Sequence, residues 1–328
     1  MVMHNWFMLV PAILATLAAG CRPEFDERSS QVSAFRVLAV RSEPAEAEPG
    51  KPVHYRALVA GTHGTTPDAA IDWGYCTLPK PLKELNDVST LCFRAAEDWI
   101  VPLGIGGEID GELPKNGCRQ FGSDVPEPKE GEPAGRPADP DGTGGYYQPV
   151  RLILPYGSGY LLTLGETRLV CGLPGATREV LSDFAKRYHP NANPELESVV
   201  ALRPDAQPLV EEGSSGDPFV VRPGETLTLR AAWPACADTD ACAGAESFVY
   251  YDLLSRSLLP RRESMRVSWF STAGAFRDDR TGRAEDDPAT TADDTWTAPS
   301  TPGDVVLWVV LRDSRGGTAW RSYRVAVR

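Results

Sequence analysis

The chain has 328 residues, which is too long for one small domain and comfortable for two of ordinary size. Its 45 acidic and 33 basic residues give a net charge of -12, and so acidic a chain disfavours nucleic acid as a partner because it repels the phosphate backbone. Its 30 glycines and 29 prolines argue against long helices and for short strands joined by turns.

An uncharged apolar run occupies residues 6–19 near the start of the chain. It is too short to span a membrane, which takes about 20 residues, and has the length of the apolar core of a secretory signal peptide. The letters LAAGC that end at Cys21 resemble the lipobox of bacterial lipoproteins. This resemblance implies that residues 1–20 are removed and that Cys21 carries lipid. An ordinary secretory peptide and a buried N-terminal helix are the alternatives.

The resemblance also implies attachment to a membrane. One acyl chain binds a membrane only marginally, whereas lipoproteins of this kind carry three, which makes attachment effectively permanent. Residues 21–32 are polar and without periodicity, so we expect a tether between the lipid and the first strand. Arg22 replaces the Asp that retains well-known lipoproteins at the inner membrane, which favours the outer membrane, with the protein facing the periplasm or the cell surface.

The remaining cysteines agree with export to an oxidising compartment. An even number of them predicts disulfides: Cys76, Cys92, Cys118, Cys171, Cys236 and Cys242. The last two flank a short loop and are expected to pair locally. The first four allow three pairings, among which Cys76–Cys92 with Cys118–Cys171 is favoured. A zinc site is the alternative, but the sequence has no Cys-x2-Cys spacing.

Residues 33–175 form the first expected domain. Apolar residues recur at every second position in one segment: Val53, Tyr55, Ala57 and Val59. The residues between them are expected to be mostly exposed to solvent. Such segments, separated by turns, predict a β-sandwich. The order of strand, Pro-Gly turn, strand and Trp-bearing strand resembles the start of bacterial immunoglobulin-like (Ig-like) domains. Residues 77–148 form a long insertion, whose tail is rich in Pro, Gly and acidic residues and is expected to be an exposed loop.

One short helix is expected in residues 176–218, which otherwise serve as a linker. Thr177 can cap its N-terminus, and Val180, Phe184 and Tyr188 follow the helical period. We expect this helix to pack on the edge of a sandwich or between the domains.

Residues 219–328 form the second expected domain. Residues 305–311 are apolar at every position, which predicts a central strand covered on both faces. Residues 313–317 are expected to form a hairpin turn before the last strand, which points Tyr323, Val325 and Val327 inward.

Short motifs in this second domain resemble PKD-like and related bacterial Ig-like repeats. They are Pro-Gly-Glu at 223–225, Val-Ser-Trp at 267–269, Trp-Thr-Ala-Pro at 296–299 and Arg-Asp at 312–313. The resemblance implies a spacer or binding module. Together with the lipobox it is typical of uncharacterised bacterial lipoproteins, so the leading hypothesis is a lipid-anchored, non-catalytic structural or interaction protein with an envelope protein as its partner.

Two other classes of function are the alternatives. An enzyme is not expected, because the three histidines after residue 20 (His54, His63 and His189) lie in no HExxH motif and no G-x-S-x-G precedes a helix. We therefore expect neither catalytic residues nor a cofactor. A hydrolase with an unrecognised site remains the remote alternative.

A glycan- or calcium-dependent binding or adhesion module is the nearer alternative. Calcium prefers several carboxylate oxygens, and the acidic loop 278–294 offers four candidate ligands: Asp278, Asp279, Asp286 and Asp287. Trp320 shares its parity with the outward residues Arg324 and Arg328, so it is expected to face solvent, where it would pair with a cation or stack on a sugar. The ordinary interpretation of the acidic residues is a solvated loop, and that of Trp320 is a side chain that covers a hydrophobic core.

Overall fold

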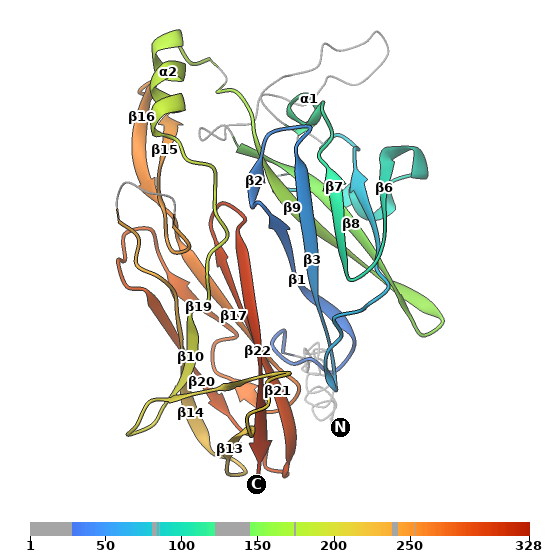
Figure 1. Ribbon diagram of the computed structural model, residues 1–328, viewed down its shortest axis with the longest axis vertical. Coiled ribbons are helices and arrows are strands. Elements are labelled where there is room, and N and C mark those ends of the chain that lie inside the picture. The colour runs from blue at the N-terminus through green and yellow to red at the C-terminus, as the bar shows by residue number, and fades with distance from the viewer. Residues whose placement is uncertain are drawn as a thin grey trace, which may run out of the picture.

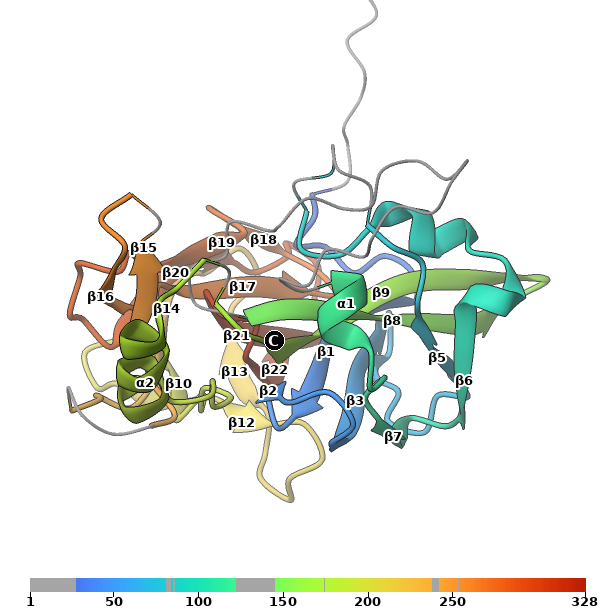
Figure 2. The same ribbon diagram turned by 90° about the horizontal axis from the view of Figure 1, so that it is seen from above.

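The computed structural model describes residues 28–80, 84, 86–121, 145–173, 175–237, 242–252 and 254–328. In this part of the chain two β-sandwiches lie side by side, as both views show (Figures 1 and 2). The predicted all-β class, with two sandwiches and a helix between them in sequence, is confirmed. The expected signal peptide and Cys21 lie outside the described residues. Among the described residues, no helix has the length and apolar character needed to cross a membrane.

The N-terminal sandwich consists of two sheets. The first contains β1 (Arg36–Glu43), β3 (Pro52–Gly61), β4 (Gly64–Thr65) and β7 (Glu108–Glu112). The second contains β2 (Glu46–Ala47), β9 (Gly159–Val170), β8 (Gly145–Tyr156), β5 (Asp72–Cys76) and β6 (Ile100–Ile105). Two 3-10 turns, η1 (Thr90–Arg94) and η2 (Glu97–Trp99), lie between β5 and β6, and helix α1 (Gly117–Phe121) lies between β7 and β8.

The core of this sandwich follows the predicted alternation. Val53, Tyr55 and Val59 of β3 are buried against Trp73 and Tyr75 of β5. The opposite face of β3 was expected to be mostly wet, and that expectation is wrong at two positions: Leu58 and Ala60 are also buried. They are apolar and are covered by the other sandwich, which a pattern within one strand cannot reveal.

The C-terminal sandwich also has two sheets. The first contains β11 (Gln207–Pro208), β10 (Ser198–Leu202), β14 (Thr226–Ala232), β20 (Thr291–Thr297) and β18 (Ala275–Phe276). The second contains β12 (Val210–Glu211), β13 (Phe219–Val221), β22 (Thr318–Val327), β21 (Gly303–Asp313), β17 (Met265–Ser271) and β19 (Arg280–Arg283). As predicted, Tyr323, Val325 and Val327 of β22 point into the core.

Strand β21 is central and covered on both faces, as its uninterrupted apolar sequence predicted. Leu307, Val309 and Leu311 enter the core of the C-terminal sandwich. Trp308 and Val310, at the alternate positions, enter a separate cluster shared with the N-terminal sandwich. The second apolar face of the strand is therefore a domain interface.

The predicted helix is α2 (Arg178–Arg187), and the Thr177 side chain accepts a hydrogen bond from the backbone N–H of Val180 as its N-cap. It packs through Phe184 on a two-stranded hairpin of β15 (Ser247–Asp252) and β16 (Ser257–Arg262). Figure 1 shows this pair at one end of the C-terminal sandwich.

The strand pairings revise two of the expected segments. Residues 198–211, expected to be linker, contribute β10, β11 and β12 to the C-terminal sheets, because Val199 and Ala201 alternate into its core. The expected insertion 77–148 contributes β6 and β7 to the N-terminal sheets, and β8 begins within it. These strands are short or rich in Gly and Pro, which weakened their sequence pattern. The remainder of the insertion from 122 to 144 lies outside the described residues.

The expected tether 21–32 is anchored at its end. Val32 is buried in the cluster between the sandwiches, and its N–H donates to the carbonyl of Ser271 at 2.8 Å. The Ser271 N–H in turn donates to the carbonyl of Ser30. Residues 30–32 therefore belong to the folded body, because Val32 is apolar and finds an apolar site.

Three disulfides link the expected cysteines. Cys76 bonds to Cys92 and Cys118 to Cys171, which is the pairing favoured from sequence, and Cys236 bonds to Cys242. The first two lie in the N-terminal sandwich, where they attach η1 and α1 to the strands.

Candidate functional site at the joint between the sandwiches

The surfaces that meet between the two sandwiches form a joint with an apolar part and a polar part. The apolar part is built from Leu38 of β1, Leu58 of β3, and Trp308 and Val310 of β21, all buried. The indole N–H of Trp308 donates to the Thr65 hydroxyl at 2.8 Å, so even the polar atom of this ring is satisfied across the joint. Burial of this area stabilises contact between the domains.

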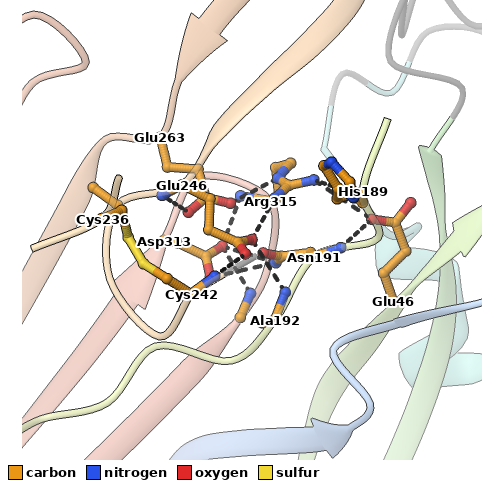
Figure 3. A network of polar contacts seen from close by, with 12 residues as sticks. Glu46, His189, Asn191, Ala192, Cys236, Cys242, Glu246, Glu263, Asp313 and Arg315 are labelled. Atoms are coloured by element: carbon orange, nitrogen blue, oxygen red, sulfur yellow. Dashed lines mark hydrogen bonds and ion pairs between the residues drawn. A yellow bond between two sulfur atoms is a disulfide. The ribbon is translucent and has the colours of Figure 1, made fainter. Parts of the chain in front are cut away.

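Arg315 is the centre of the polar part (Figure 3). It lies in the β21–β22 turn and its side chain is 2% exposed. Its guanidinium is 2.6 Å from a carboxylate oxygen of Glu263 and 2.5 Å from one of Glu246. A third carboxylate, that of Glu46 in β2, is 3.8 Å away and belongs to the other sandwich. A charge so completely removed from water is tolerated only when it is paired in this way.

The chain between the sandwiches completes the cluster. The Tyr188 hydroxyl donates to Glu46 at 2.7 Å and the Asn191 N–H donates to it at 2.8 Å. The carbonyl of His189 accepts from Arg315 at 3.0 Å. Figure 3 shows His189 and Asn191 between Glu46 on one side and the C-terminal carboxylates on the other. The linker therefore serves as a layer of the joint and contacts both domains.

Acidic groups outnumber basic ones in this cluster. Glu46, Glu246, Glu263 and Asp313 surround Arg315, with Arg168 a further cation 3.3 Å from Glu46. Burial, together with the neighbouring Asp313, raises the pKa of Glu263 to about 8. Burial also raises the pKa of Glu246 and of Asp313. The joint therefore favours a retained proton near neutral pH.

Trp320, the candidate ligand residue, is half-buried and packs against the apolar part of the joint. The expected cation is present, since the Arg56 guanidinium lies 6.0 Å from the ring centroid, but Arg56 belongs to the N-terminal sandwich. The ring is not fully solvent-facing, because the N-terminal sandwich covers it in part. Trp296 of the Trp-Thr-Ala-Pro motif is fully buried.

The four aspartates considered for calcium do not converge. Asp278 accepts from Arg277, Asp279 from Ser29, and Asp287 from Arg283. Asp286 is exposed. Among the described residues, no group of three or more His, Cys, Asp or Glu side chains could hold a metal ion.

The three histidines occupy separate places. His54 in β3 contacts Asp110 of β7 at 2.8 Å on an exposed face, and His63 lies in the β3–β4 turn. His189 contributes its backbone carbonyl to Arg315.

Sequence reasoning missed the residues that make the joint. Residues 313–317 were interpreted as a hairpin turn, which is correct, but nothing in the pattern marked Arg315 as buried. Glu46 and Glu263 likewise stand in segments with turn-like composition. An isolated charged residue gives no local signal of burial, because its partners come from other parts of the chain.

Comparisons with known proteins add little to this picture. No family model and no curated protein matches the chain. Among solved structures, latent PorU from Porphyromonas gingivalis is 11% identical, with 91% of this chain and 24% of that chain covered and a TM-score of 0.21. A DUF4785 family protein from Legionella pneumophila is 10% identical, with 88% and 56% covered and a TM-score of 0.20.

The adhesin InvE of Yersinia pseudotuberculosis is 8% identical, with 88% and 58% covered and a TM-score of 0.24. The chain thus spans between about a quarter and three fifths of the length of these structures. TM-scores this low carry no argument about function. The description of the protein as a two-domain β-sandwich protein rests on its own strand pairing.

Proposed function

We propose that the protein is a lipid-anchored structural or protein-interaction module of the bacterial cell envelope, in which two Ig-like sandwiches, the second PKD-like, act as one rigid unit. The observation that carries this proposal is the ion cluster at the joint, where Arg315 of one sandwich and Glu46 of the other are both buried. A spacer or a presenting module needs a fixed geometry between its domains, and this joint supplies it.

The interactions that would be lost if the sandwiches separated support a rigid joint. Separating the sandwiches would break the Arg315–Glu46 contact across the joint and the hydrogen bonds that Tyr188 and Asn191 donate to Glu46. It would also expose Trp308, Val310, Leu38 and Leu58 to water. Domains joined only by a polar contact of modest area move relative to one another by default, and a buried apolar joint opposes that motion.

The anchor in this proposal is Cys21, with residues 1–20 as its signal peptide, and the outer membrane as the location. The experiment expresses the full chain in a bacterial host beside a Cys21→Ser variant. We expect the unaltered protein in the membrane fraction, with a mass that includes diacylglycerol and an N-terminal acyl chain. The variant should appear in the soluble periplasmic fraction. An unmodified amino terminus in membrane-derived protein would refute the anchor.

The partner in this proposal is another envelope protein. Crosslinking in intact membranes, followed by identification of the crosslinked neighbours, tests this part of the proposal. The matched control is the Cys21→Ser protein, which has the same domains without the anchor. A neighbour enriched only with the anchored protein supports the interaction role. Turnover of any small substrate by the purified chain would instead favour an enzyme.

A further inference from the structure

A cavity of about 450 Å³ lies between the two sandwiches, apart from the pairings of Arg315. One wall is formed by β1 and the β8–β9 hairpin of the N-terminal sandwich. The other wall is formed by β17, β21 and the turn at 313–317. This volume lies within the range of roughly 300–1,000 Å³ that is typical of small-molecule sites, which also favour domain interfaces.

The C-terminal wall presents two guanidinium groups. Arg266 of β17 and Arg312 of β21 stand directly opposite each other in adjacent strands. Like charges in that position destabilise a sheet. In the described part of the chain neither forms an ion pair with a carboxylate, and Arg312 donates to the carbonyl of Leu38 at 2.8 Å. Burial, with the positive charge of Arg280 beside it, lowers the pKa of Arg312 to about 10. This wall favours an anionic group.

The N-terminal wall presents an acidic group. Glu166 of β9 is half-buried and lines the cavity, and no hydrogen bond or ion pair of its carboxylate is found within the described residues. Burial, with the nearby charge of Asp87, raises the pKa of Glu166 to about 7, although the charges of Arg312 and Arg168 act in the opposite direction. This wall favours a cationic donor.

The two walls are joined by the hydrogen bond from Arg312 to the Leu38 carbonyl, but their charged groups do not pair. Arg312 lowers the pKa of Glu166, yet the two side chains form no ion pair. A lone anion in the cavity would satisfy the arginines but would leave Glu166 unpaired beside it. A lone cation would leave the two guanidinium groups facing each other. A molecule with both charges complements Glu166 on one wall and Arg266 and Arg312 on the other.

We propose that this cavity binds a small zwitterion, an amino acid or a short peptide with free ends, whose ammonium group lies at Glu166 and whose carboxylate lies at Arg266 and Arg312. This activity goes beyond the structural role proposed above and does not require the lipid anchor. Failure of one proposal therefore leaves the other standing.

Calorimetric titration of the full chain tests the proposal with glycine, glycylglycine and triglycine, which offer the two charges at increasing separation. We expect saturable binding of at least one of them, and a loss of affinity of at least tenfold when its amino end is acetylated or its carboxyl end is amidated. Absence of heat with all three at tens of millimolar would overturn the proposal. Equal binding of the acetylated form would also overturn it, since the site would then be selective for anions alone.

Two variants test which wall of the cavity binds which charged group of the ligand. Glu166→Gln should weaken binding at least tenfold and should abolish the discrimination against the acetylated ligand. Arg266→Gln, at an exposed position, should abolish the discrimination against the amidated ligand. Glu48→Gln and Arg222→Gln, both at exposed positions away from the cavity, are the matched controls and should bind normally. Unchanged affinity in both cavity variants, with unchanged thermal unfolding, would refute the assignment.

Discussion

Arg315 and Glu46 lie 3.8 Å apart across the joint, although one belongs to the last hairpin of the C-terminal sandwich and the other to a two-residue strand of the N-terminal sandwich. Both side chains are almost completely removed from water. Their contact ties together sheets that are distant in sequence, and the stability of the protein should depend on it in ways that can be measured.

Replacing Arg315 with methionine should destabilise the protein strongly. The substitution fills much of the same space but leaves Glu246, Glu263 and Glu46 without their cation, at a cost of about 3–5 kcal/mol in the free energy of unfolding. Urea denaturation followed by tryptophan fluorescence measures this cost. Arg222→Met, at an exposed position, is the control and should change little. A loss below about 1 kcal/mol would show that the cluster does not hold the joint.

Stability should rise as the pH falls from 8 towards 5, because of Glu263. Its pKa in the folded protein is about 8, above the ordinary value of 4.5, so the folded protein binds the proton more tightly than the unfolded chain does. That contribution is complete below the unfolded pKa and is lost as the pH rises through 8. Glu263→Gln should reduce the change in unfolding free energy between pH 5 and pH 8 by more than ~1 kcal/mol.

The control for this pH dependence is Glu285→Gln, which alters a half-exposed surface ion pair with Arg261. Its pH profile should match that of the unaltered protein. A steeper profile for Glu263→Gln would contradict the assignment of the retained proton to this side chain.

Trp308→Ala should loosen the contact between the sandwiches. The change removes a fully buried ring and its hydrogen bond to Thr65, at a cost of about 3–5 kcal/mol. Small-angle X-ray scattering should show a larger radius of gyration if the domains separate. Trp99→Ala, at a position 38% exposed, is the matched control. A lower free energy of unfolding with an unchanged radius of gyration would mean that the domains stay in contact around the cavity left by the ring.

The two disulfides that close the longest and the shortest loops should contribute unequally. Cys118 and Cys171 are 53 residues apart, and Cys236 and Cys242 are 6 apart. On the chain-entropy account, losing the first costs about 4 kcal/mol and losing the second about 2 kcal/mol. Thermal unfolding of the two double-alanine variants measures the difference. Equal losses would show that native contacts, and not loop closure, dominate.

Several features of this protein were determined by local sequence alone. Thr177 capped the helix as predicted, because a cap is made by residues three positions apart. The hydrophobic run of β21 predicted a strand covered on both faces, because period and composition are properties of a single segment. The pairing of the first four cysteines was not determined in this way, since the sequence left three pairings open and the structure contains the favoured one.

Other features were decided only by tertiary structure. Whether Trp320 faces solvent and whether Leu58 is exposed depend on what the other sandwich covers. Whether Arg315 is a surface turn residue depends on carboxylates from distant parts of the chain. The cavity walls likewise come from β9 and β21, which meet only when the domains dock. A side chain's environment at such a joint is set by residues far away in the chain. Local periodicity reports which face of a strand is apolar, and not which partner will cover it.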